Sequence, residues 1–224
     1  MDEEPLIRWD WIGRNWNTGR AGSIWDLTVD HIIMSGLPVI LSLLAAVPIG
    51  LAAVRWRWLY QPTAGLMNVI YALPSLPVFM LLIPVTGLER ATVVIPLTFY
   101  GAAVLIPAVV EGITSIPEHV RQSAVAAGFT PLRRLLRVEL VLAMPVVLAG
   151  LRVVAVSSIS LVSIGALIGQ GGLGNLFTDA FKRDFPTPAV VGITLIVLLA
   201  LVADGLLIFL QRVLTPWTRA GGRA

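Results

Sequence analysis

Side chains that could do chemistry are sparse in this sequence. There is no cysteine in the 224 residues, so a disulfide framework and a thiolate metal site are both excluded. The two histidines, His31 and His119, stand far apart on different segments, which argues against a metal centre. A GxxxxGK[ST] phosphate loop is also missing, so the chain is not expected to bind ATP in the manner of an ATPase subunit.

Four glycines near residue 170 have the form of a nucleotide-binding motif in an unsuitable context. Gly169, Gly171 and Gly174 are spaced as G-x-G-x-x-G, the dinucleotide fingerprint. The apolar run before them, 141–168, is far longer than a strand of about 3 to 10 residues, and no βαβ pattern surrounds it. With Gly172, these glycines instead predict a tight turn at the outer end of a span, using positive φ or close packing.

Arg152 and Asp204 are ionisable residues inside long apolar runs, where a charge is costly and usually has a function or a partner. They could pair with each other. We favour a structural ion pair, and a polar lining of a transport route is the alternative.

Composition sets the class of the elements that carry these residues. The chain is 57% hydrophobic and 13% charged, with a mean hydropathy of +0.86, against roughly 25% charged residues in soluble proteins. An all-α integral membrane protein is therefore expected, with about five transmembrane helices, or six. The predicted spans are 31–54, 62–84, 91–110, 141–168 and 189–210.

The distribution of arginine predicts the orientation. Arg55, Arg121 and Arg212 belong to alternate connections and the tail, which the positive-inside rule places in the cytoplasm. The N-terminus is then outside and the C-terminus inside. Residues 1–30 contain four tryptophans and are expected to lie along the membrane surface, residues 31–214 to form the transmembrane domain, and residues 215–224 to form a cytoplasmic tail.

A polar segment, residues 115–140, separates the third and fourth spans. Ser115 and Glu118 predict a capping box that starts a helix, and Gly128 is expected to end it. Thr130 and Pro131 predict the start of a second helix, with leucines on one side and arginines on the other. The small side chains of the first helix suit docking into a groove of a partner. The alternatives are a nucleic-acid-binding helix pair, which the flanking spans oppose, and an amphipathic loop touching lipid headgroups.

Prolines interrupt several spans, and the freed backbone groups must be satisfied by neighbouring helices or water. Because broken helices often surround a substrate path, Tyr71, Pro74 and Ser75 are candidates for the transport pathway. The alternative is that proline is simply commoner in transmembrane helices.

Residues 116–152 resemble the coupling segment of permease subunits of binding-protein-dependent ABC importers, whose signature is EAA, three residues, then Gly. Gly128 matches, and the triplet falls on Gln122, Ser123 and Ala124, so two of its three letters depart. The sequences YALPSLPVFMLLIP from Tyr71 and ALIGQGGLGNLFTDAF from Ala166 resemble permeases for osmoprotectants such as glycine betaine, choline, carnitine or proline betaine. The resemblance extends from about Trp9 to Leu214.

The resemblance implies a type I importer permease fold in the bacterial cell membrane, with no catalytic site and no cofactor on this chain. ATP and Mg would be bound by a partner ATP-binding subunit. An extracytoplasmic substrate-binding protein, carrying the aromatic cage for the solute, and a second permease copy or paralogue would complete the complex within the lipid bilayer, without nucleic acid. The residues implied in ATPase docking are Gln122, Ser123, Ala124, Ala127, Gly128 and Arg133.

Three other functions stay open from the sequence. A permease for an amino acid such as methionine would share the same architecture. An ion-coupled secondary transporter would suit the broken helices, although no inverted repeat is detectable. In a membrane scaffold without transport activity, the polar segment would serve as a binding module.

Overall fold

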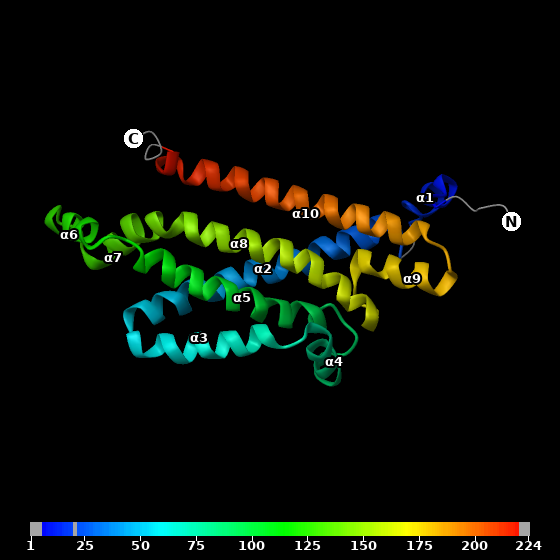
Figure 1. Ribbon diagram of the computed structural model, residues 1–224, viewed down its shortest axis with the longest axis horizontal. Coiled ribbons are helices and arrows are strands. Elements are labelled where there is room, and N and C mark those ends of the chain that lie inside the picture. The colour runs from blue at the N-terminus through cyan, green and yellow to red at the C-terminus, as the bar shows by residue number, and fades with distance from the viewer. Residues whose placement is uncertain (1–5, 20–21, 220–224) are drawn as a thin grey trace. The chain divides into compact units, whose positions relative to one another are not determined.

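The computed structural model describes residues 6–19 and 22–219, and these residues form helices and no strands (Figure 1). The α-helices are α1 Trp9–Asn15, α2 Ile24–Arg55, α3 Arg57–Ala72, α4 Ser75–Thr86, α5 Ala91–Thr114, α6 Glu118–Ala126, α7 Pro131–Arg134, α8 Leu140–Val162, α9 Asn175–Arg183 and α10 Thr187–Leu214. A π-helix, η1 Leu135–Glu139, joins α7 to α8, and the 3₁₀ segments are η2 Ser163–Ile168, η3 Gly172–Gly174 and η4 Pro216–Arg219. Residues 220–224 of the predicted tail lie outside the described part.

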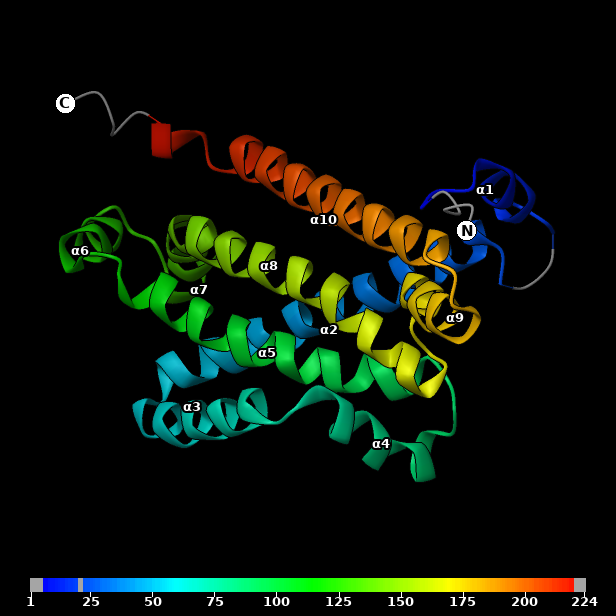
Figure 2. The ribbon, with the colours of Figure 1, turned by 45° about the vertical axis from the view of Figure 1, so that its right-hand side comes forward.

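Four stretches of helix are long and apolar enough to cross a membrane: Ile24–Arg55, Ala91–Thr114, Pro131–Ile168 and Thr187–Leu214. A fifth crossing requires α3 and α4 together, and the chain leaves regular helix between them at Leu73–Pro74 (Figure 2). The two helices are bent by 95° at this break. The expected span 62–84 is therefore a broken one. Pro74 is the N-cap of α4, and proline disfavours helical geometry in the residue before it.

The first long helix starts earlier than the sequence predicted. α2 begins at Ile24 instead of near His31, so part of the expected surface segment is helix continuous with the first span. Before it, the side chains of Trp9 and Trp16 are exposed, as interfacial tryptophans would be. This segment is held in place because Thr187 Oγ1 accepts a hydrogen bond from Arg8 N at 3.1 Å and donates one to Leu6 O at 3.0 Å.

The chain divides into two packing units. The first comprises residues 1–39, 73–98 and 155–202. Its described core contains Ile24, Met34, Phe79, Val93 and Leu173, all nearly or fully buried. This unit therefore contains the turn that carries the clustered glycines.

The second unit comprises residues 40–72, 99–154 and 203–224. Val109, Ile113 and Ala143 form its buried centre. Close helix packing depends on small residues here: a Cβ on Gly112 would lie 3.0 Å from the carbonyl oxygen of Ala143. This unit positions the polar segment between the third and fourth spans.

Candidate functional site

Helix α6 is the first half of the predicted coupling segment, and its start differs from the expectation. The helix begins at Glu118 with Pro117 as N-cap and no side-chain capping bond, so the predicted capping box is wrong. Ser115 Oγ instead donates to the carbonyl oxygen of Gly112 at 3.1 Å, which keeps it with the end of α5. Proline has no backbone N–H, but an N–H at the N-cap position is not used in the hydrogen bonds of the helix. The fixed φ of proline also suits entry into the helix.

The predicted end of this helix is confirmed. Gly128 has φ of +79°, a left-handed conformation that glycine adopts without strain. The Phe129 N–H then donates to the carbonyl oxygen of Ala124 at 3.1 Å, which satisfies one of the last carbonyls of α6. Gly128 therefore serves the backbone turn between α6 and α7.

The side chains of α6 face in different directions. Gln122, Ser123 and Ala127 are exposed, as a docking surface requires. Ala124, although part of the family triplet, is only 8% exposed and packs within the chain. Val125 is 54% exposed, and sequence analysis missed it because a single valine between alanines carries no distinctive pattern. The exposed face of α6 thus combines polar groups with one apolar side chain.

The second half of the segment is not a separate helix. Thr130 is the N-cap of α7 and Pro131 its first residue, but Thr130 makes no capping bond through its side chain. After four residues the chain continues as the π-helix η1 and then α8, so α7 is the entry to the fourth span. Arg133 is exposed on α7, where the side chain is accessible to a partner.

A single carboxylate holds the polar segment to the start of α8. Glu139, 7% exposed, accepts a hydrogen bond from Arg134 Nε at 2.8 Å and lies 3.9 Å from Arg121 Nε. Arg121 Nη2 also donates to the carbonyl oxygen of Ile113 at 2.7 Å. Glu139 was not singled out from the sequence, because its pairing depends on the extra residue of the π-helix. π-bulges frequently mark functional sites.

The four glycines form the tight turn that the sequence predicted. Gly169 has φ of +78° and Gly172 of +51°, values that side-chain-bearing residues rarely adopt. A Cβ on Gly172 would come within 2.8 Å of the His31 Cα, and one on Gly174 within 2.7 Å of the Ser163 Cα. Gly171 packs equally closely against Ala166. The glycines are therefore needed for the backbone conformation and the close packing of this turn.

His31 anchors this turn. It is fully buried, and its Nδ1 accepts a hydrogen bond from the Leu173 N–H at 3.2 Å, while Nε2 lies 2.8 Å from the Ile159 carbonyl oxygen. This pattern requires the proton on Nε2. This anchoring role could not be predicted from the sequence, because the two partners of His31 are more than 120 residues away along the chain, beyond any local pattern.

Arg152 and Asp204 contact each other as the sequence suggested they could. Arg152 Nε donates to Asp204 Oδ1 at 2.7 Å and Nη2 to Oδ2 at 3.1 Å, a bidentate geometry. Both side chains are about one third exposed. The pair joins α8 to the last turns of α10.

The pathway candidates lie at the break of the second span. Tyr71 is near the end of α3 and is exposed, while Pro74 is the N-cap of α4 and Ser75 its first residue. The break leaves residue Leu73 and Pro74 outside regular helix. This is the type of broken helix that the prolines predicted.

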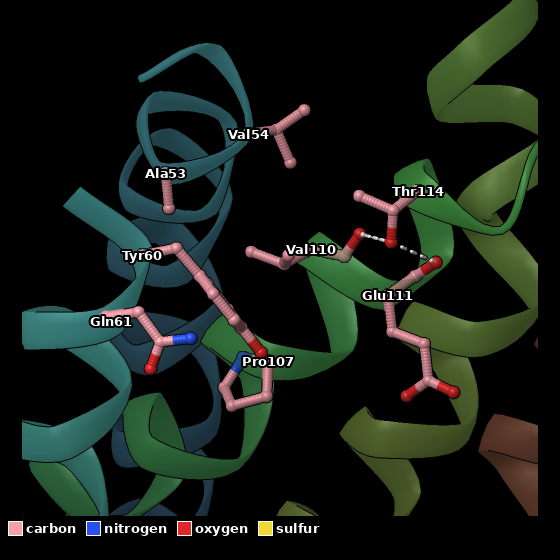
Figure 3. Close-up of a pocket in the computed structure, with 8 residues that line it drawn as sticks. All are labelled: Ala53, Val54, Tyr60, Gln61, Pro107, Val110, Glu111 and Thr114. Atoms are coloured by element: carbon pink, nitrogen blue, oxygen red, sulfur yellow. Dashed lines mark hydrogen bonds between the residues drawn. The ribbon is translucent and has the colours of Figure 1, made fainter. Parts of the chain in front are cut away.

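A pocket of about 510 Å³ in the second unit does not bring reactive side chains together (Figure 3). It is lined by Ala53, Val54, Tyr60, Gln61, Pro107, Val110, Glu111 and Thr114. The Thr114 hydroxyl is occupied, because it donates to the Val110 carbonyl oxygen at 2.8 Å, and the Glu111 carboxylate lies apart from the Tyr60 side chain (Figure 3). None of the residues predicted from the sequence lines this pocket, and its polar groups do not converge.

Comparison with known proteins adds a family to this geometry. The model of the family described as "Binding-protein-dependent transport system inner membrane component" matches residues 33–219. The osmoprotectant import permease protein OsmW of Salmonella typhimurium is 33% identical over 201 residues, covering 88% of this chain and 94% of that protein. The choline transport system permease protein OpuBB of Bacillus subtilis is 31% identical over 196 residues, covering 88% and 90%.

Solved structures resemble the chain in fold. Two crystal forms of the inward-facing MetNI methionine ABC transporter match with TM-scores of 0.67 and 0.74. The second match is 18% identical and covers 91% of this chain and 98% of the solved one. At this identity the similarity indicates a shared fold.

Proposed function

The chain belongs to the family of inner-membrane components of binding-protein-dependent transport systems, as an ABC importer permease subunit, and we propose that it imports quaternary-ammonium osmoprotectants. Glycine betaine, choline, carnitine and proline betaine are the solutes in question. The observation that carries this proposal is similarity above 30% identity across nearly the whole chain to an osmoprotectant permease and a choline permease.

ATP-driven coupling acts through α6. The exposed side chains of Gln122, Ser123, Val125 and Ala127 offer a surface to a cytoplasmic ATP-binding subunit, which binds ATP and Mg. Ala124 supports this surface from within the chain, Gly128 supplies the turn behind it, and Arg133 adds a charge on α7. Since Gln122 stands where the family has an acidic residue, the contact to the ATPase uses a neutral amide.

Two permease subunits form the pathway, as copies or paralogues. Up to five crossings in one chain are few for enclosing a route across the membrane. The apolar exposed side chains of α10, such as Leu201, Leu206 and Phe209, need cover from lipid or a second subunit. An extracytoplasmic binding protein delivers the solute and carries the aromatic cage.

The orientation follows the arginine distribution, with the N-terminus outside and the C-terminus in the cytoplasm. In that orientation α6 is cytoplasmic, and the glycine turn at Gly169–Gly174 lies on the outer side. The turn shapes the outer gate or the surface for the binding protein.

The intramembrane polar residues divide into two roles. Tyr71, Pro74 and Ser75 border the pathway, because the break between α3 and α4 frees backbone groups that a polar route can satisfy. Arg152 and Asp204 hold α8 and α10 together through their bidentate contact.

Solute-stimulated ATPase activity tests the solute class. The permease and its ATPase subunit are reconstituted in nanodiscs, and hydrolysis is measured with the candidate binding protein loaded with glycine betaine, choline or methionine. Stimulation by the quaternary ammonium compounds but not methionine supports the proposal. Stimulation by methionine alone would assign the chain to amino-acid import.

A further inference from the structure

A second pocket, of about 460 Å³, differs from the first in its charge. We call it the basic pocket, and its polar lining consists of Arg55, Arg121, Arg134 and Glu139. Arg55 ends α2, Arg121 lies in α6, Arg134 ends α7 and Glu139 ends η1, all in the second unit. Three guanidinium groups against one carboxylate leave two positive charges in excess.

The hydrogen bonds within the basic pocket do not use all of its donors. Glu139 is occupied by Arg134, and it lies 3.9 Å from Arg121 Nε, too far for a hydrogen bond. Among the described residues, none accepts a hydrogen bond from the buried Arg121 Nε, a costly arrangement for a charged group, although Arg121 Nη2 donates to the Ile113 carbonyl oxygen. Arg55 is exposed, and none of the ion pairs recorded for the described residues includes it. Arg55 can therefore bind an anionic ligand, and Arg121 adds a second positive charge to the lining of the same pocket.

The surroundings of the basic pocket favour a lipid over a soluble anion. Leu51, Leu132 and Leu135 share its lining with the arginines. Leu132 is 64% exposed at the beginning of the apolar stretch Pro131–Ile168, where a span enters the membrane interface. A small soluble anion would gain nothing from leucine side chains, whereas a phospholipid presents a phosphate next to apolar chains.

We propose that the basic pocket binds the phosphate of an anionic phospholipid headgroup. Arg55 and Arg121 contact the phosphate, and the leucines contact the apolar part of the lipid. The bound lipid links the end of α2 to α6, so the membrane holds the helix that faces the ATPase. This site is independent of which solute the chain transports.

Lipid retention by the intact chain tests the proposal. The full-length protein in detergent is mixed with phosphatidylglycerol or phosphatidylcholine, and bound lipid is counted by native mass spectrometry. Preferential retention of phosphatidylglycerol is expected, and Arg55→Gln should weaken it about fivefold, since each arginine near an anionic headgroup contributes a factor of this size. Arg55→Lys keeps the charge and should retain most of the binding.

Arg137→Gln is the matched control, because Arg137 is an exposed arginine of the same polar segment that does not line the pocket. Equal retention of the two lipids, or equal effects of Arg55→Gln and Arg137→Gln, would overturn the proposal. Displacement of lipid by millimolar inorganic phosphate, without preference between the lipids, would assign the pocket to a soluble anion. Loss of the bound lipid when the ATPase subunit is added would overturn the proposal, because the basic pocket would then be a contact site for that subunit.

Discussion

Ala124 and Val125 are neighbours in α6 with opposite environments, one buried in the chain and the other exposed. A bulky residue at Ala124 would disturb the fold of the segment before it reached a docked partner. Val125 is the better probe of docking, because its side chain already points away from the chain.

Val125→Asp should therefore abolish most docking while leaving the permease folded. Placing a carboxylate in an apolar contact costs on the order of 1–3 kcal/mol, which corresponds to a loss of affinity of about 5-fold to 150-fold. Co-purification of the ATPase subunit with the tagged permease measures the effect. Val125→Ile is the control and should bind normally; unchanged co-purification of Val125→Asp would place the docking surface elsewhere.

His31 offers a second test at this scale, because the other histidine is exposed on α6. His31→Ala leaves the Leu173 N–H and the Ile159 carbonyl oxygen unsatisfied in a buried site and should destabilise the chain by about 1–3 kcal/mol. Thermal unfolding in detergent measures the loss of stability, and faster hydrogen exchange of the Leu173 amide shows where the structure is weakened. His119→Ala should change neither, and a comparable loss from both variants would mean that His31 is not an anchor.

At the scale of elements, the sequence predicted the apolar spans and the turns better than the joints between them. The turns at Gly128 and at the four clustered glycines were predicted correctly, because glycine locally signals either a positive φ, as at Gly128, Gly169 and Gly172, or close packing, as at Gly171 and Gly174. The capping box failed, because Ser115 bonds back to α5 and Pro117 already starts α6. The prolines predicted an interruption of the second span, but the 95° angle at Leu73–Pro74 and the π-helix before α8 depend on packing, which a local pattern does not contain.

The contact between Arg152 and Asp204 is an element-scale feature, since it joins α8 to α10. Arg152→Gln or Asp204→Asn should each lower the amount of assembled protein several-fold, because the remaining charge loses its partner. Uptake per assembled complex should stay near that of the unchanged protein. The double variant, which leaves no unpaired charge, should recover part of the yield.

These outcomes separate the structural role from a pathway role. Normal assembly of Asp204→Asn with lost uptake would contradict the structural role and assign the carboxylate to the route of the solute.

At the scale of the whole molecule, composition predicted a helical membrane protein and the coupling segment predicted the ABC importer permease family. The helical fold of the described residues and the family are both confirmed. Family membership was visible because the segment around Gly128 and the glycine turn are encoded in short stretches. The basic pocket and the His31 anchor were not visible, because each combines residues from distant parts of the chain.

The absence of cysteine allows a direct test of orientation. Single cysteines replace two exposed polar residues, Asn17 before α2 and Ser123 in α6. In intact cells, a membrane-impermeant maleimide should label Asn17→Cys and leave Ser123→Cys unlabelled until the membrane is opened. The reverse pattern would contradict the orientation inferred from the arginines.

This chain is proposed to import quaternary-ammonium solutes with energy from ATP hydrolysis. The most direct measurement is uptake of radiolabelled glycine betaine or choline into proteoliposomes that contain the permease with its ATPase subunit, with the binding protein added outside. Uptake should require enclosed ATP, persist without an ion gradient and ignore excess unlabelled methionine. Uptake driven by an ion gradient without ATP, or competed only by methionine, would contradict the account.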